Sequence, residues 1–256
     1  MKEIKQILIL TLFLYANIAF SQEVKQIELI GDRPDQTESA FTIPKGYFQF
    51  EDGFLFENET NETQNISFSS MLLRYGLFDN FELRFATEYN KTKSNRFTDI
   101  SGFSPLTIGG KIHVNKEKGW IPQIAFLAHI NIAQTGEKEF MQDFHSTQMA
   151  LTFNHTINEM WSVGYSLGVE FPSDINYSIG TYTVVSGFAI REKIGAFVEA
   201  YGDFSQYMYA DNNLNGGVTF LVLPNLQLDI AGGFGLSQNS YKNYFGFGII
   251  YLFKLN

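Results

Sequence analysis

The sequence predicts a transmembrane antiparallel up-and-down β-barrel of about 12 strands, and three observations carry this prediction. The final segment, residues 243–253, reads NYFGFGIIYLF, with aromatic or apolar residues on one parity, whereas the other parity begins with Tyr244, Gly246 and Gly248. An export-type segment stands at the N-terminus, and apolar and polar residues alternate along much of the remaining chain. Strands that are apolar on one face and small or polar on the other suit a barrel with lipid outside and a polar lumen.

The composition of the 256 residues agrees with an envelope protein and excludes several other classes. The chain has 26 Phe, 13 Tyr and 22 Gly but no Cys, which excludes disulfide frameworks and thiolate metal sites. Its net charge of −9 argues against a nucleic-acid partner, because phosphate-binding domains carry basic surfaces. The mean hydropathy is close to neutral, as expected where alternation along the strands conceals an apolar outer face.

Residues 1–21 are predicted to be a signal peptide that is cleaved between Ser21 and Gln22. A basic start precedes an apolar run over residues 7–15, and the small residues Ala19 and Ser21 occupy the −3 and −1 positions. The run is much shorter than the roughly 20 apolar residues that a membrane-spanning helix requires. We therefore expect export to the outer membrane, with outer-membrane lipid and the outer-membrane assembly machinery as partners.

Twelve segments of roughly ten residues each read as strands, the length that tilted barrel strands need. They lie near residues 47–57, 65–77, 81–90, 104–114, 120–132, 144–157, 161–171, 179–190, 195–205, 213–223, 226–236 and 243–253. The connections alternate between short ones, such as 78–80 and 224–225, and longer ones, such as 91–103 and 133–143. Tight periplasmic turns and longer external loops are typical of these barrels, so we place the barrel domain at residues 47–256 with its termini in the periplasm.

Side-chain parity assigns the two faces of each predicted strand. The third strand places Phe81, Leu83 and Phe85 on one face. Glu82 and Arg84 lie on the other face. Because residues two apart share a face of a strand, the apolar sets are expected to meet lipid and the charged and small sets to line the lumen.

Two tryptophans support this orientation. Trp120 and Trp161 both open predicted strands directly after short turns, where an interfacial aromatic girdle would lie. A soluble all-β protein is the main structural alternative, because alternation also describes half-buried strands. The export segment, the excess of Phe and Tyr, and the charges on the interior parity favour the membrane barrel.

Residues 32–51, DRPDQTESAFTIPKGYFQFE, resemble the opening of a family of bacterial outer-membrane β-barrel transporters, the meta-pathway phenol-degradation family. The similarity continues in LRYGL at 73–77, FELR at 81–84, GGK at 109–111 and PNLQLD at 224–229. The resemblance spans most of the mature chain and implies a barrel that passes small molecules, including hydrophobic or aromatic ones. The FSQ at 20–22 and the bias toward Asn, Lys and Phe are similar to those of Bacteroidota proteins.

Charged residues on the interior parity are the candidates for a solute path through the lumen. They are Glu51, Arg74, Glu82, Arg84, Glu88, Lys111, Glu170, Glu199 and Asp229. Arg74 and Glu82 flank one short turn, so we expect them to face each other. For any single residue we favour the alternative that it belongs to a network filling a narrow barrel, since buried charge persists only where it is paired.

Residues 22–46 form a polar N-terminal extension that holds Asp32, Arg33, Asp35 and Glu38. Such a segment cannot rest in lipid, where its backbone would lack hydrogen-bond partners. It must hang in the periplasm or enter the lumen, and we predict that it enters the barrel and partly occludes it. Its carboxylates lack the Gly-centred loop and ligand spacing of a Ca²⁺ site.

No pattern in the chain predicts catalysis, a metal or a cofactor. The 4 His residues lack the spacing of a zinc site. A membrane-embedded lipid hydrolase is the less favoured reading, and it would need Ser or Asp beside His129 at the outer rim. The predicted function is a passive outer-membrane channel for small molecules, and the alternative is a non-conducting barrel with a structural or interaction role.

Overall fold

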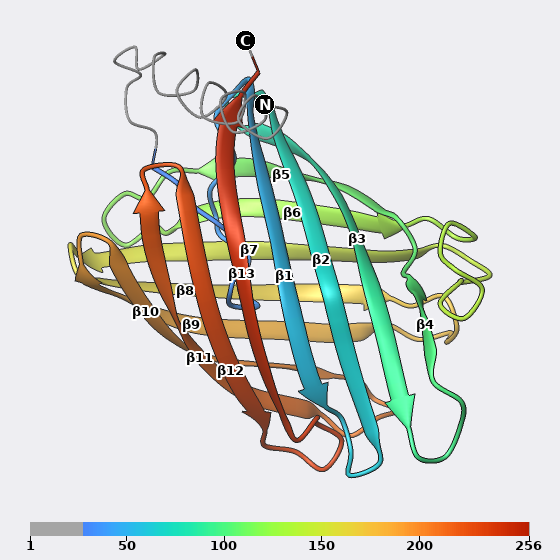
Figure 1. Ribbon diagram of the computed structural model, residues 1–256. Helices are drawn as coiled ribbons and strands as arrows, with labels where there is room; N and C mark the ends of the chain where they lie inside the picture. Colours follow the sequence, from blue (N-terminus) through green and yellow to red (C-terminus); the bar gives the residue numbers. More distant parts are fainter. Residues whose placement is uncertain (1–27, 256) are drawn as a thin grey trace, which may run out of the picture.

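The computed structural model describes residues 28–255, which form a β-barrel whose wall surrounds an irregular segment (Figure 1). The predicted signal peptide, its cleavage site and the first residues of the extension lie outside the described part of the chain. Within the described residues, no helix is long and apolar enough to cross a membrane.

The wall is one antiparallel sheet that closes on itself. Its strands are β1 (Tyr47–Asn58), β2 (Thr63–Phe78), β3 (Phe81–Ser94), β4 (Ile100–Phe103), β5 (Thr107–Asn115), β6 (Gln123–Asn131), β7 (Ser146–Asn158), β8 (Trp161–Phe171), β9 (Ile179–Arg191), β10 (Ile194–Phe204), β11 (Asp211–Leu223), β12 (Leu226–Gly235) and β13 (Asn243–Lys254). β4 and β5 both pair with β3, at successive positions along it, so they occupy one place in the ring. The prediction of a closed barrel with twelve strand positions is confirmed.

The barrel closes between its first and last strands. β1 and β13 pair without interruption from Tyr47 opposite Lys254 to Asn58 opposite Asn243. Aromatic rings reinforce this seam on the outside, where Phe54 stacks on Phe247 with ring centroids 5.2 Å apart. Such cross-strand aromatic pairs stabilise adjacent strands beyond the area that they bury.

Two predicted boundaries are wrong. The expected loop at 91–103 contains the end of β3 and all of β4, which extend the β3 hairpin beyond the main wall. Pro105, which has no N–H to donate, lies between β4 and β5, where the strand is interrupted. β6 begins at Gln123 rather than 120, because Lys118 and Ile121 form an isolated bridge that keeps Trp120 in the turn, 98% exposed.

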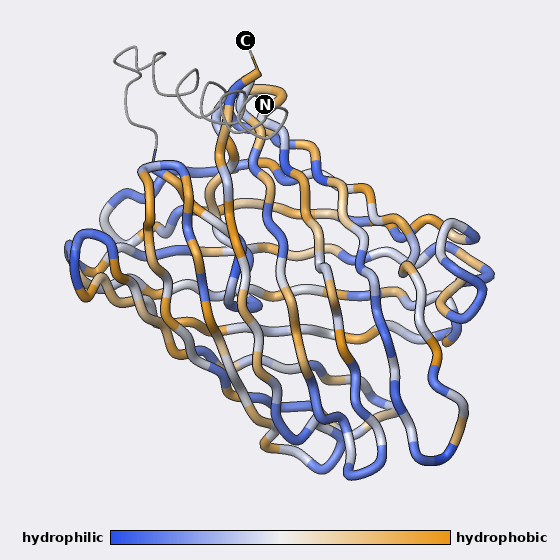
Figure 2. Tube along the Cα trace, viewed as in Figure 1, coloured by the Kyte–Doolittle hydropathy of each residue, from blue (hydrophilic) through white to orange (hydrophobic). Residues whose placement is uncertain are grey.

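Burial in this barrel is the reverse of that in a water-soluble protein, as the parity analysis predicts. The largest side chains that are completely buried are mostly charged, among them Arg74, Lys111 and Glu82. Large apolar side chains such as Leu167 and Ile230 are exposed on the outer surface. Figure 2 shows apolar and polar residues alternating along the strands. An apolar exterior around a polar lumen matches a barrel surrounded by lipid.

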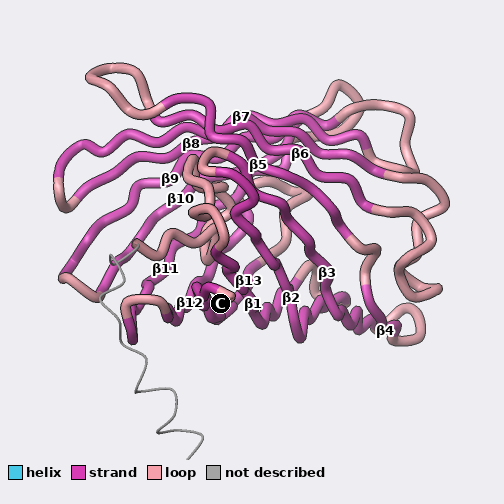
Figure 3. The backbone as a smooth tube through the Cα atoms, turned by 90° about the horizontal axis from the view of Figure 1, so that it is seen from above, coloured by secondary structure: helices cyan, strands magenta, loops and turns pink. Residues whose placement is uncertain are grey.

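The N-terminal segment, residues 28–46, runs inside the barrel before it joins β1. Viewed from above, loop backbone lies within the ring of strands (Figure 3), and its side chains bond to strands around the ring. The exit turn depends on Gly46, whose φ of 79° is a left-handed conformation that favours glycine. The Gly46 N–H donates to the Gly76 carbonyl at 2.7 Å, and a side chain at Gly76 would collide with the Pro44 carbonyl. Pro44 and Gly46 therefore set the turn that leads from the lumen into the wall.

Candidate functional site

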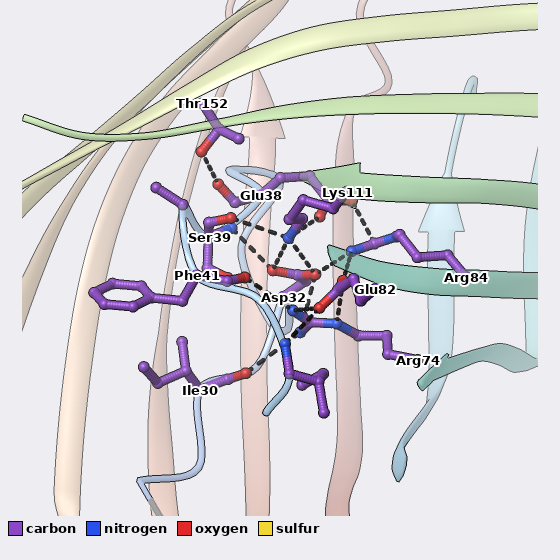
Figure 4. A network of polar contacts seen from close by, with 12 residues as sticks. Ile30, Asp32, Glu38, Ser39, Phe41, Arg74, Glu82, Arg84, Lys111 and Thr152 are labelled. Atoms are coloured by element: carbon purple, nitrogen blue, oxygen red, sulfur yellow. Dashed lines mark hydrogen bonds and ion pairs between the residues drawn. The ribbon is translucent and has the colours of Figure 1, made fainter. Parts of the chain in front are cut away.

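Asp32 is the centre of a buried charge cluster that fixes the N-terminal segment to the barrel wall (Figure 4). Its Oδ2 atom lies 3.0 Å from Arg74 Nη1, 2.6 Å from Arg84 Nη1 and 2.9 Å from Lys111 Nζ. The carboxylate side chain is only 3% exposed. Three cations from β2, β3 and β5 therefore converge on one carboxylate of the segment.

Carboxylates of the wall and of the segment complete this cluster. Arg74 Nε lies 2.9 Å from Glu82 Oε1, and Arg74 Nη1 lies 3.0 Å from Glu51 Oε1. Glu38 lies 2.8 Å from Arg84 and 3.1 Å from Lys111. Four carboxylates thus surround three cations, and this mutual pairing satisfies the condition under which buried charges persist. The expected contact between Arg74 and Glu82 is present.

The cluster controls the ionisation of Asp32. Burial alone would raise the pKa of this carboxyl, but the positive charges of Arg74, Lys111 and Arg84 outweigh it and hold the pKa well below its usual value. Asp32 therefore stays charged and keeps its ion pairs over the physiological pH range.

A second group of contacts ties the segment to β7, β9 and β10. The Gln36 N–H donates to Glu199 Oε2 at 2.8 Å, and the Thr37 hydroxyl donates to Glu199 Oε1 at 2.6 Å. The hydroxyl oxygens of Thr37 and Thr183 lie 2.7 Å apart, and Thr152 donates to the Glu38 carbonyl at 2.5 Å. The segment is therefore held from several sides of the lumen.

Asp35 differs from Asp32 in its electrostatic surroundings. Burial and the neighbouring Glu199 carboxylate both raise its pKa well above the usual value. In contrast to the pKa of Asp32, the pKa of Asp35 is therefore shifted upward, so Asp35 is protonated more easily than Asp32.

Arg33 makes a separate contact with the wall. Its Nη2 lies 3.1 Å from Asp229 Oδ1 and its Nε lies 3.4 Å from Asp229 Oδ2, which is a bidentate arrangement. Its Nη1 reaches Ser70 Oγ at 3.5 Å. The guanidinium rests against Gly53 and Gly248, where an added Cβ would overlap with it. Arg33 therefore occupies a recess that the two glycines leave in the wall.

Two cavities lie on either side of the segment. One of about 490 Å³ reaches Asn90, Thr92 and Phe140 at the long-loop end of the barrel. The other, of about 570 Å³, reaches the short turn between β7 and β8 at 158–161. We call them the external and the periplasmic vestibule. Arg33, Pro34 and Asp35 line both vestibules and form the boundary between them.

The structure places all nine predicted lumen residues inside the barrel, in two groups. Glu51, Arg74, Glu82, Arg84, Lys111, Glu199 and Asp229 are buried and contact the N-terminal segment or its anchoring residues. Glu88 and Glu170 line a further cavity of about 250 Å³. The parity argument placed small residues such as Gly248 in the lumen but gave them no role. It did not single out Thr152 or Thr183 as contacts of the segment, because a neutral side chain does not indicate its partner in a sequence.

His129 lines the same 250 Å³ cavity and so faces the lumen rather than lipid. Its Nε2 is buried and has no hydrogen-bond partner within the described residues. The arrangement that a membrane hydrolase would need, with Ser or Asp paired to His129 at the outer rim, is therefore not formed there. Across residues 28–255, no group of three or more His, Asp or Glu is placed to hold a metal ion.

The sequence matches a known protein family, and the fold is similar to that of solved outer membrane proteins. A family model described as "Putative MetA-pathway of phenol degradation" matches residues 31–253. The fold is similar to that of the COG4313 outer membrane channel from Pseudomonas putida F1, with a TM-score of 0.67, 12% identity, and coverage of 86% of this chain and 99% of that chain. It is also similar to the NanC porin, with a TM-score of 0.53, 9% identity, and coverage of 80% and 98%. A search of curated proteins finds no match to the sequence.

Proposed function

Because this chain belongs to the family described as "Putative MetA-pathway of phenol degradation", we propose that it is an outer-membrane channel for passive passage of small molecules. The observation that carries this proposal is the pair of vestibules that enter the lumen from opposite ends. Among residues 28–255, only Arg33, Pro34 and Asp35 line both of them, so a thin boundary separates the two compartments. A modest displacement at this boundary would join them into a continuous path.

The lumen also offers a surface for solutes that are not fully polar. Val185, Phe197, Ala231 and Tyr244 form a buried apolar cluster on the inner face, with Leu55 and Tyr241 packed against it. Charges concentrate instead around Asp32. An amphipathic lumen of this kind suits small hydrophobic or aromatic molecules, in agreement with the family description, and the charged residues named above would line the remainder of the path.

A non-conducting barrel with a structural role is the second candidate. The observation that favours it is the dense bonding of the N-terminal segment to the wall, with Arg33, Pro34 and Asp35 lying between the two vestibules. Both functions place the protein in the outer membrane with its apolar exterior against lipid. For both, we propose that residues 1–21 direct export and that the outer-membrane assembly machinery inserts the barrel.

Adjacent residues on β12 provide a test that separates these two functions. Ala231 lines the external vestibule, whereas Ile230 is exposed on the outer surface. Ala231→Trp is expected to reduce the single-channel conductance in planar bilayers severalfold, because the indole ring would fill the lumen beside Phe197. Ile230→Trp, which places the same ring in lipid, should leave the conductance unchanged.

Folding of both variants is checked by their retarded gel mobility before boiling, which a closed hydrogen-bonded barrel retains in detergent. Equal conductance of the two folded variants, or no conductance in the wild type, would exclude the channel and favour the structural barrel.

A further inference from the structure

We propose that Arg33 is the gate residue of this channel: solutes pass when its side chain leaves Asp229, while the Asp32 cluster keeps the rest of the N-terminal segment in the lumen. The proposal rests on the proposed channel function and specifies which part of the segment moves. In this proposal Asp32 is the anchor that holds the segment in the lumen, and the next residue, Arg33, is the gate.

The wall beneath Arg33 is shaped to receive a movable side chain. Asp229, Gly248 and Gly53 stand directly opposite one another on β12, β13 and β1. The guanidinium spans this row: its Nε and Nη2 bond to the Asp229 carboxylate, and the group lies against the two glycines. The recess exists because neither glycine projects a side chain into the lumen, so an empty recess would leave a gap along the wall.

The neighbouring row, two residues further toward the long-loop end, carries no polar side chain. It runs through Phe197, Gly217, Ala231, Gly246 and Leu55 on five consecutive strands of the closed barrel, β10 to β13 and β1. Phe197 lines the periplasmic vestibule, and Ala231, Gly246 and Leu55 line the external one. An apolar surface therefore passes from one vestibule to the other directly beside the recess of Arg33.

Burial distinguishes the anchor from the gate. The Asp32 side chain is 3% exposed and contacts three cations, whereas the Arg33 side chain is 21% exposed and pairs with one carboxylate. Separation of a buried ion pair leaves charges without water. When Arg33 moves, its own guanidinium reaches water and this cost falls on the single carboxylate of Asp229, whose side chain is 0% exposed. Release of the whole segment would also separate the Asp32 carboxylate from three buried cations, so movement at Arg33 costs less.

The chemistry of the recess and of the apolar row beside it indicates which solutes pass the gate most readily. The row from Phe197 to Leu55 has no polar side chains. An uncharged molecule with an apolar face can therefore move along this row without breaking hydrogen bonds to side chains of the wall. If that face is aromatic, the displaced guanidinium can stack on it through a cation–π contact. The geometry thus points to neutral aromatic molecules as the solutes that open the gate most readily.

A reversible crosslink tests whether the segment stays in place during passage. The chain has no Cys, so Thr37→Cys with Thr183→Cys introduces a single pair. The two native hydroxyl oxygens are 2.7 Å apart, which suits a disulfide between these positions. Oxidation would fix the segment to β9 while leaving Arg33 free, and the reduced form of the same protein is the matched control.

We expect the same single-channel conductance from the oxidised and the reduced protein in planar bilayers. Adding Arg33→Ala should raise the conductance severalfold in both redox forms. Loss of conductance on oxidation, reversed by reductant, would overturn the proposal while leaving the channel function intact, because the whole segment would then have to move. No effect of Arg33→Ala would also overturn it, and a wild type without conductance would overturn both the gate and the channel.

Gly53→Ala provides an independent variant that keeps Arg33 in the chain. The added methyl group fills the recess and displaces the guanidinium, so the conductance should rise as in Arg33→Ala. Gly232→Ala is the matched control, since its Cβ meets only the Tyr244 carbonyl at 3.2 Å and lies on the outward parity of β12. Equal conductance of the two glycine variants would contradict the role of the recess.

Discussion

Asp32→Ala is expected to release the N-terminal segment from the lumen and to increase the conductance of the barrel. The carboxylate is buried and contacts Arg74, Arg84 and Lys111, so its removal deletes the main attachment of the segment. Breaking a buried ion pair costs roughly 3–5 kcal/mol, which is enough to reverse the docking of a short segment. The wall should remain folded, because Arg74 keeps Glu51 and Glu82 as partners and Arg84 keeps Glu82. Lys111 pairs with Asp32 and Glu38 of the segment, and release of the segment would expose its ammonium group to water in the vacated lumen.

Release can be measured with a cysteine at Ala40, which is completely buried in the lumen. Ala40→Cys should resist a water-soluble maleimide in the otherwise native chain and react readily when Asp32→Ala is also present. Asp99→Ala is the control, because Asp99 pairs with Lys91 at the surface, where an ion pair contributes little. Equal labelling with and without Asp32 would show that the cluster does not hold the segment.

Leu167→Arg is expected to destabilise the barrel by about 2–4 kcal/mol, because it places a charge against lipid near the midplane. Leu167 lies in the middle of β8 and is 60% exposed on the outer surface. Phe171→Arg, on the same face but at the end of the strand, should cost only about 0–1 kcal/mol, since charge is tolerated near the interface.

The measurement is urea unfolding in lipid vesicles, followed by the loss of the gel mobility of the folded form. If Leu167→Arg left the free energy of unfolding unchanged, or if both substitutions lowered it equally, this face would not meet lipid at the expected depth.

The wall of the barrel could be predicted closely from the sequence because lipid and lumen impose opposite demands on alternate residues. β8 and β13 show this most clearly, since their alternation of large apolar with small residues fixes both their limits and their faces. The start of β6 was misplaced because Trp120 has the preference of a strand residue, whereas the bridge between Lys118 and Ile121 keeps it in the turn. The end of β3, residues 91–94, was missed because its polar residues give no alternation, and β4 was missed because its four residues are too few to show a period.

The contacts of the N-terminal segment could be predicted less well from the sequence. The sequence indicated that the segment with Asp32, Arg33, Asp35 and Glu38 would enter the lumen, but not which residues it would contact there. Arg33 and Asp229 are 196 residues apart, and they meet only because β1 and β13 close the ring in one register. The recess over Gly53 and Gly248 depends on that same register, so no local pattern identifies it.

The single-channel conductance of the wild type, compared with that of a variant lacking residues 22–40 in planar bilayers, tests the central claim most directly. Both proteins should fold into barrels, and the deletion should conduct far more because it removes Asp32, Arg33 and the boundary between the vestibules. Equal conductance would contradict occlusion of the lumen by the segment, and the absence of conductance from both proteins would contradict a channel.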